Sequence, residues 1–65
     1  MELIVNGERC QASADTLAAL MIELSYVGGW LATARNGEVV PAAERRHCRL
    51  ADGDCIEILS PMKGG

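Results

Sequence analysis

Two consecutive glycines close the sequence, Gly64 and Gly65, and they are the residues best suited to chemistry. A glycine carboxylate has no Cβ beside it, so a narrow enzyme slot can enclose it from every direction. The segment 60–65 reaches roughly 20 Å when extended, at ~3.3 Å per residue, which is enough to enter the active site of another protein. What such a tail offers an enzyme is its end, the Gly65 carboxylate, with Met62, Lys63 and Gly64 as the tail before it. The ordinary alternative is a frayed chain end.

Sequence composition divides the chain into a folded part, residues 1–59, and a flexible tail, residues 60–65. The chain is 65 residues long, 49% hydrophobic and 23% charged, which is typical of one small globular domain with a packed core. Pro61 lacks a backbone N–H and would end a sheet ladder there. The net charge of −3 argues against a nucleic-acid partner or an anionic membrane surface.

The cysteines and the apolar runs indicate the cellular setting. Cys10, Cys48 and Cys55 are odd in number, far apart, and lack the spacing of zinc or iron–sulfur ligands. No signal peptide is visible, and no apolar run approaches the ~20 residues that cross a bilayer. We expect a cytoplasmic protein, monomeric when free, with no metal and no bound cofactor.

Alternation and turn residues predict a β-hairpin at the start of the chain. Leu3 and Val5 alternate with more polar or outward positions, and Asn6-Gly7 is a dipeptide of two-residue hairpin turns, leading to a return strand over residues 8–12. A helix follows over about residues 16–24, capped by Ser13 or Asp15. Its apolar stripe is Leu17, Leu20, Met21 and Leu24. We expect Gly28-Gly29 to supply the left-handed turn after it.

The second half of the chain predicts another hairpin and a final strand. Residues 30–35 have small side chains at alternate positions, which would let a helix lie close, and Asn36-Gly37 is a second hairpin turn before residues 38–40. Residues 42–47 favour a turn or a single helical turn. Around it lies the basic cluster, which is either a solvated connection or a docking patch for an acidic partner: Arg45, Arg46, His47 and Arg49.

The last apolar run, residues 55–59, predicts a strand that carries the tail. Ile56 and Ile58 would face the core, with Cys55, Glu57 and Leu59 facing out. If the outward Ile4 lies beside Leu59 on an adjacent strand, the two form an exposed apolar patch next to the tail, and such patches commonly dock partners. The predicted core is Leu3, Val5, Leu17, Leu20, Leu24, Ile56 and Ile58.

In this order of elements and motifs the chain resembles the ThiS family of ubiquitin-like sulfur carriers. The motifs are the opening to Asn6-Gly7, the stretch 36–41 (NGEVVP), the stretch 52–58 (DGDCIEI) and the final Gly64-Gly65. The resemblance implies an α+β, β-grasp fold, in which a mixed sheet of four to five strands cups one helix. The first and last strands would then lie in parallel at the centre of the sheet.

The resemblance also implies a carrier rather than an enzyme. By this resemblance, a ThiF-type adenylyltransferase would use ATP to adenylate the Gly65 carboxylate. A persulfide donor such as a cysteine desulfurase would then convert the adenylate into a thiocarboxylate. A ThiG-type thiazole synthase then takes the sulfur for the thiazole ring of thiamine. The sequence itself has no glycine-rich phosphate-binding loop and no nucleophile and base at a readable spacing, so activation would belong to the partner.

Three other functions stay open on the sequence. The first is a carrier like the small subunit of molybdopterin synthase, which shares the fold. The second is a ubiquitin-like protein modifier; Lys63 is the only lysine and lies in the tail itself, which argues against chain building but not against conjugation to other proteins. The third is a non-covalent interaction module, in which the double glycine has no role.

Overall fold

The computed structural model describes residues 1–27 and 30–60, and these form one sheet with helices on one of its faces. The predicted tail residues Met62, Lys63, Gly64 and Gly65 lie outside the described residues, as do Gly28 and Gly29. In chain order the elements are β1 (Glu2–Val5), β2 (Glu8–Gln11), α1 (Leu17–Glu23), β3 (Ala32–Arg35), β4 (Glu38–Val39), the 3₁₀ helix η1 (Ala42–His47) and β5 (Cys55–Leu59).

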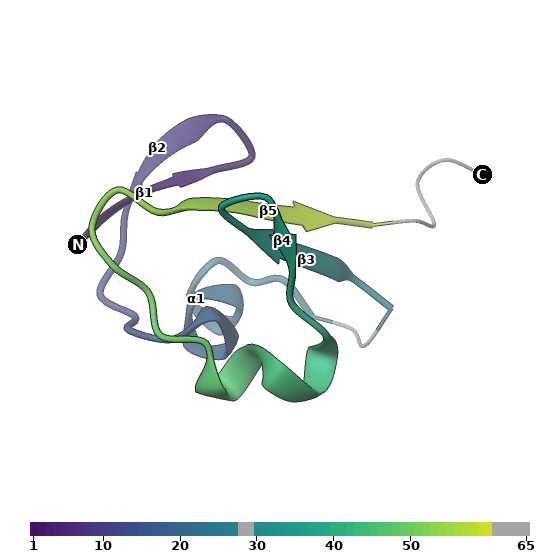
Figure 1. Cartoon of the computed structure of the whole chain (residues 1–65). Coiled ribbons are helices and arrows are strands. Elements are labelled where there is room, and N and C mark those ends of the chain that lie inside the picture. Colours follow the sequence, from purple (N-terminus) through teal and green to yellow (C-terminus); the bar gives the residue numbers. More distant parts are fainter. Residues whose placement is uncertain (28–29, 61–65) are drawn as a thin grey trace.

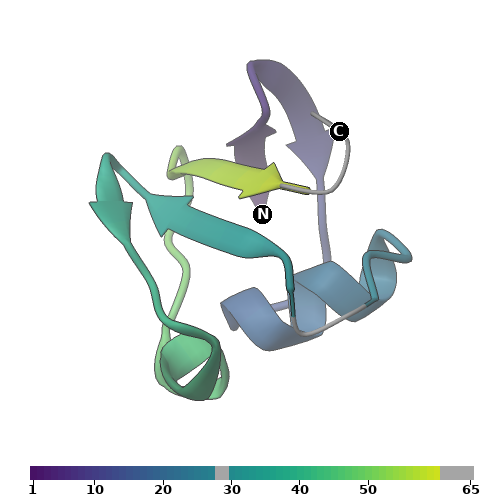
Figure 2. The same cartoon turned by 90° about the vertical axis from the view of Figure 1, so that its right-hand side faces the viewer.

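The five strands have the order β2-β1-β5-β3-β4, so the first and last strands of the chain lie side by side at the centre (Figure 1). β1 and β5 are parallel, and every other neighbouring pair is antiparallel. Figure 2 shows α1 and η1 on the same side of this sheet. The predicted β-grasp arrangement is therefore confirmed, with five strands.

Both predicted hairpin turns are present at the Asn-Gly dipeptides. Asn6 and Gly7 have φ of 52° and 84°, and Asn36 and Gly37 have φ of 52° and 86°. Positive φ at both central residues is what a two-residue turn needs to match the twist of its strands. Glycine and asparagine tolerate this conformation better than other residues, which is why the dipeptide located both turns correctly.

The ends of α1 differ from the prediction. Neither Ser13 nor Asp15 caps it; the cap is Thr16, whose hydroxyl accepts a hydrogen bond from the Ala19 N–H at 3.2 Å. Thr16 is the cap because it directly precedes Leu17, the first residue of the helix, and has the extended backbone conformation typical of an N-cap residue. After the helix, Ser25 takes the left-handed conformation, with φ of 66°.

The core lies between α1 and the sheet, and it contains most of the predicted residues. Leu3, Leu17, Leu20 and Ile56 are fully buried. Leu24 is only partly buried, because it caps the end of α1 at the rim of the cluster. The remaining buried hydrophobic residues are Val5, Ala12, Met21, Leu31, Leu50 and Ile58.

The prediction that the small residues of β3 face the helix was wrong. The small residues Ala32 and Ala34 pair with Leu59 and Glu57, so they lie on the outer face of the sheet, away from α1. Thr33 pairs with the buried Ile58 and is itself buried. The register with β5 decides this, because directly paired residues share a face.

The basic cluster is also divided by the structure. Arg45 is buried, and it donates from Nε to the Thr33 hydroxyl at 3.0 Å and from a terminal nitrogen to the Leu31 carbonyl. It therefore joins η1 to the sheet rather than facing solvent. Arg49 is exposed and lies 3.5 Å from Asp15. Residues 42–47, predicted to form a turn or a single helical turn, form a six-residue 3₁₀ helix.

Candidate functional site at the root of the tail

β5 positions the start of the tail, since it is a central strand and its last residue, Leu59, directly precedes Ser60. Along β5, Ile56 and Ile58 face the core while Cys55, Glu57 and Leu59 are exposed, as predicted. Strand β1, however, ends at Val5, level with Ile56. The last part of β5 therefore needs another partner on its β1 side.

The side chain of Asn6 supplies that partner. Its Oδ1 accepts a hydrogen bond from the Ile58 N–H at 2.9 Å, and its Nδ2 donates to the Ile58 carbonyl at 3.2 Å. The side-chain amide thus pairs with a strand residue as a peptide group would. Nδ2 also lies 3.3 Å from the Tyr26 hydroxyl, which accepts from it. The strand is held in line to a point two residues before Ser60.

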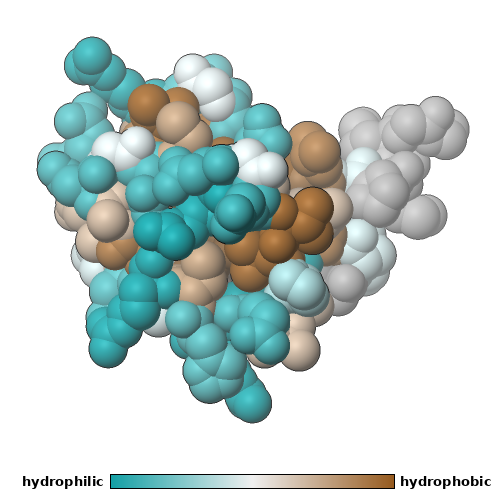
Figure 3. Space-filling model, viewed as in Figure 1, coloured by the Kyte–Doolittle hydropathy of each residue, from teal (hydrophilic) through white to brown (hydrophobic). Residues whose placement is uncertain are grey.

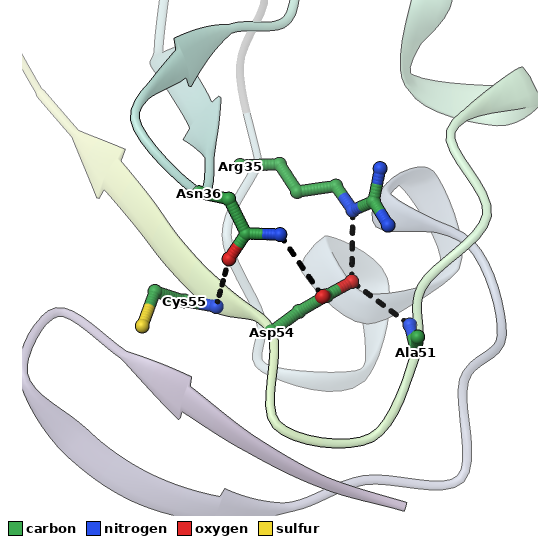
Figure 4. A network of polar contacts seen from close by, with 5 residues as sticks. All are labelled: Arg35, Asn36, Ala51, Asp54 and Cys55. Carbon is green, nitrogen blue, oxygen red and sulfur yellow. Dashed lines mark hydrogen bonds and ion pairs between the residues drawn. The ribbon is translucent and has the colours of Figure 1, made fainter.

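Asn36 does the same at the beginning of β5. Its Oδ1 accepts from the Cys55 N–H at 2.9 Å, and its backbone N–H donates to the Cys55 carbonyl at 2.7 Å. Figure 4 shows how its Nδ2 continues into a network centred on Asp54. The two asparagines of the hairpin turns therefore fix the two ends of the strand that carries the tail.

The carboxylate of Asp54 collects three hydrogen bonds (Figure 4). Oδ2 accepts from Arg35 Nε at 2.8 Å and from the Ala51 N–H at 2.8 Å, while Oδ1 accepts from Asn36 at 3.0 Å. Burial raises the pKa of Asp54, but these hydrogen bonds and the charge of Arg35 outweigh it, so the pKa lies below its ordinary value. The hydrogen bond between Arg35 and Asp54 raises the pKa of Arg35. Asp54 is thus an ionised structural group at neutral pH.

An apolar surface lies on the outer face of the sheet at the tail end of β5. It consists of Ala32, Ala34, Val39 and Leu59, and we call it the tail-root patch. Val39 is 80% and Leu59 59% exposed. The patch borders a shallow groove of about 250 Å³, and Figure 3 shows hydrophobic side chains gathered over β3 and β4.

Ile4 and Leu59 lie on adjacent strands and on the same face, but they are not neighbours. Ile4 pairs with Cys55, at the opposite end of β5 from Leu59. Four residues of strand, roughly 13 Å at about 3.3 Å each, separate the two positions. The docking role of both residues stays a prediction, and the geometry assigns only Leu59 to the tail-root patch.

Comparison with known proteins identifies the family. The model of the ThiS family matches residues 3–65, which is nearly the whole chain including the double glycine. The chain belongs to the ThiS family.

Solved structures agree with this assignment. The crystal structure of the thiamine biosynthesis protein ThiS from Geobacter metallireducens is 29% identical, with a TM-score of 0.83 and full coverage of both chains. A solution structure of a thiamine biosynthesis protein from the same species is 28% identical, with a TM-score of 0.81, and the match covers all of this chain and 88% of that one.

A curated relative is longer. A thiazole synthase of Paramagnetospirillum magneticum is 38% identical over 66 aligned residues, which cover 100% of this chain and 20% of that protein. The chain therefore spans 20% of the length of the curated relative that it matches.

Other types of site are not found in the part of the chain that the structure describes. Residues 1–27 and 30–60 contain no group of three or more histidine, cysteine or acidic side chains arranged to hold a metal ion. Within the same residues no helix is long and apolar enough to cross a membrane. Cys10, Cys48 and Cys55 are free thiols.

Sequence reasoning missed the second role of Asn6 and Asn36. Their turn positions were readable, and the choice of asparagine over glycine or aspartate was the available signal for an amide that both donates and accepts. It also missed Val39 as part of the tail-root patch. The hairpin turn at Asn36-Gly37 placed residues 38–40 beside residues 30–35, but nothing in the sequence showed which face of the sheet Val39 would occupy.

Proposed function

We propose that this chain is a sulfur carrier of thiamine biosynthesis, with the Gly65 carboxylate as the group that carries sulfur. The observation behind the proposal is the match to the ThiS family from residue 3 to residue 65, which includes Gly64 and Gly65. The fold supports it, because β5, the strand that precedes those glycines in the sequence, is fixed at both ends by Asn6 and Asn36.

The chemistry needs activation, because a carboxylate repels nucleophiles and its oxygen is a poor leaving group. In the proposed reaction the Gly65 carboxylate oxygen attacks the α-phosphorus of ATP in an adenylyltransferase, and pyrophosphate leaves. The terminal sulfur of a persulfide, such as that of a cysteine desulfurase, attacks the acyl carbon, and AMP leaves. A thiol reductant then cleaves the sulfur–sulfur bond, leaving a thiocarboxylate on Gly65. The carrier supplies no catalytic group in these steps.

The proposed acceptor is a thiazole synthase, and the proposed location is the cytoplasm, where ATP is available. The support for the acceptor is the curated relative, a thiazole synthase in which 20% of the length resembles this chain. Both enzymes would read the same terminal glycines in turn. Without a side chain, these glycines fit two differently shaped slots.

The intact mass of the protein tests the proposal. After incubation with the adenylyltransferase, ATP, a persulfide donor and a thiol reductant, the mass should rise by the difference between one sulfur and one oxygen, located in the C-terminal peptide. Deleting Gly65, or appending one residue after it, should abolish the gain, since either change moves the carboxylate by about 3.5 Å.

The cysteines provide the control. Replacing Cys10, Cys48 and Cys55 by serine should leave the sulfur gain intact, because the acceptor is the terminal carboxylate. A gain that disappears in this variant and survives the deletion of Gly65 would place the sulfur on a side chain and refute the carrier proposal.

A further inference from the structure

A second apolar surface lies on the helix side of the sheet, away from the tail-root patch. An open groove of about 650 Å³ runs between α1 and η1, with Ala42 and Ala43 in its wall. Ile22 and Val27, which also line it, are each 76% exposed. Neither side chain belongs to the hydrophobic core. Exposed apolar surface next to a groove is typical of an interaction site.

The groove also carries uncompensated positive charge. Arg45 and Arg46 line it, and no ion pair within residues 1–27 and 30–60 involves either of them. Arg45 is only 8% exposed, so its charge is largely removed from water. Its hydrogen bonds to Thr33 and Leu31 use two of the five N–H donors of a guanidinium, and both acceptors are neutral. A buried cation without an acid is costly, and a carboxylate brought into the groove would compensate it.

Local charge distinguishes this groove from the rest of the molecule. The chain as a whole has a net charge of −3, yet the groove is lined by two arginines and by no acidic residue among the described ones. Its complement is therefore an apolar segment that carries at least one carboxylate. Electrostatic complementarity of this kind selects the partner and its orientation.

We propose that the groove between α1 and η1 docks such a carboxylate-bearing apolar segment of a thiazole synthase. This inference rests on the proposed function. The choice of occupant follows from the curated relative, in which a region that resembles this chain is part of a thiazole synthase. The groove and the tail-root patch lie on opposite faces of the sheet, so synthase docking leaves the patch free for the adenylyltransferase.

The test measures the affinity of the full chain, without added sulfur, for purified thiazole synthase from the same organism by isothermal titration calorimetry. Ile22→Glu and Arg46→Glu should each weaken binding by about tenfold or more, because they place negative charge where the segment docks. Arg9→Glu is the control matched to Arg46→Glu: the Arg9 side chain is 87% exposed on β2, outside the groove, and its replacement changes the net charge as much as Arg46→Glu does. It should alter the affinity by less than about twofold.

The same variants are titrated with the adenylyltransferase, for which less than about twofold change is expected. Thermal melts establish that each variant is folded. Unchanged synthase affinity in Ile22→Glu and Arg46→Glu overturns the proposal, and so does an equal loss in Arg9→Glu, which would reveal a long-range charge effect. An equal loss for the adenylyltransferase, or no synthase binding by the wild type, also overturns it. The sulfur gain at Gly65 is measured separately, so failure of the groove and failure of the carrier function are distinguishable.

Discussion

At the level of single residues, the two hairpin asparagines combine two properties. Asn6 and Asn36 each take a positive φ, and each also uses its side-chain amide to bind β5. Glycine would satisfy the first requirement and not the second. Asp54 also stabilises the start of the strand, because its carboxylate accepts hydrogen bonds from Arg35, Asn36 and the Ala51 N–H.

Hydrogen exchange should distinguish the separate contributions of Asn6 and Asn36 to β5. Asn6→Gly keeps the turn but removes the bond to the Ile58 N–H, so exchange of this amide should accelerate by about fivefold, as one net hydrogen bond is worth about 1 kcal/mol. Asn36→Gly should accelerate exchange of the Cys55 amide instead. Each variant is the control for the other, and acceleration of both amides in both variants would show that neither asparagine acts locally.

Asp54 predicts a pH dependence of stability. Its pKa is lower in the folded state than the ordinary 3.8, so the ionised form stabilises the fold, and this contribution is complete above that value. It is lost as the pH falls below about 4 and through the lower folded-state pKa. Urea denaturation between about pH 2 and 7 should show this loss, and Asp54→Asn should reduce it. An unchanged pH profile in Asp54→Asn would exclude Asp54 as the group responsible.

At the level of elements, α1 packs against the sheet by one apolar face. Leu17, Leu20 and Met21 are buried against the strands, while Ile22 on the same helix is 76% exposed. The ends of the helix are tied to the chain around it. Thr16 caps its start, and the Glu23 carboxylate near its end accepts from the Ser13 and Ala14 N–H groups at 3.2 and 3.0 Å.

Truncation within α1 should distinguish its two faces. Leu20→Ala should lower the free energy of unfolding by about 2 to 5 kcal/mol, because it removes a fully buried side chain and leaves a cavity. Ile22→Ala should change it by less than about 0.5 kcal/mol. Both are measured by chemical denaturation. Equal losses would mean that the exposed face of α1 also contributes to the fold.

At the level of the whole molecule, the sheet separates two apolar surfaces. The tail-root patch lies on the outer face at the end of β5, and the groove between α1 and η1 lies on the helix side. For the function proposed above, two separate surfaces would let one enzyme bind before the other has fully left.

The tail-root patch predicts unequal roles for Ile4 and Leu59. Leu59→Glu should weaken binding of the adenylyltransferase by about tenfold or more, because Leu59 is 59% exposed in an apolar patch next to the tail. Ile4→Glu should weaken it less, because Ile4 pairs with Cys55 at the far end of β5. Affinities are measured by calorimetry, with thermal melts as the control for folding. A larger loss in Ile4→Glu would move the docking surface to the β1 side of the sheet.

The sequence by itself determined the features that depend on near neighbours. Asn-Gly dipeptides located both hairpins, the spacing of Leu17, Leu20 and Met21 predicted the buried face of α1, and alternation in β5 separated its inner and outer residues. Turn conformation and residue periodicity are local properties, so they can be read from consecutive residues.

Tertiary structure alone decided the features that depend on register and on contacts distant in sequence. The pairing of Thr33 with Ile58 turned Ala32 and Ala34 outward, and the parallel pairing of β1 and β5 separated Ile4 from Leu59. The burial of Arg45 and the bonds from Asn6 to Ile58 likewise join segments far apart in the chain. A one-residue shift in strand pairing would reverse the faces without changing the sequence pattern, so only packing around the common core fixes them.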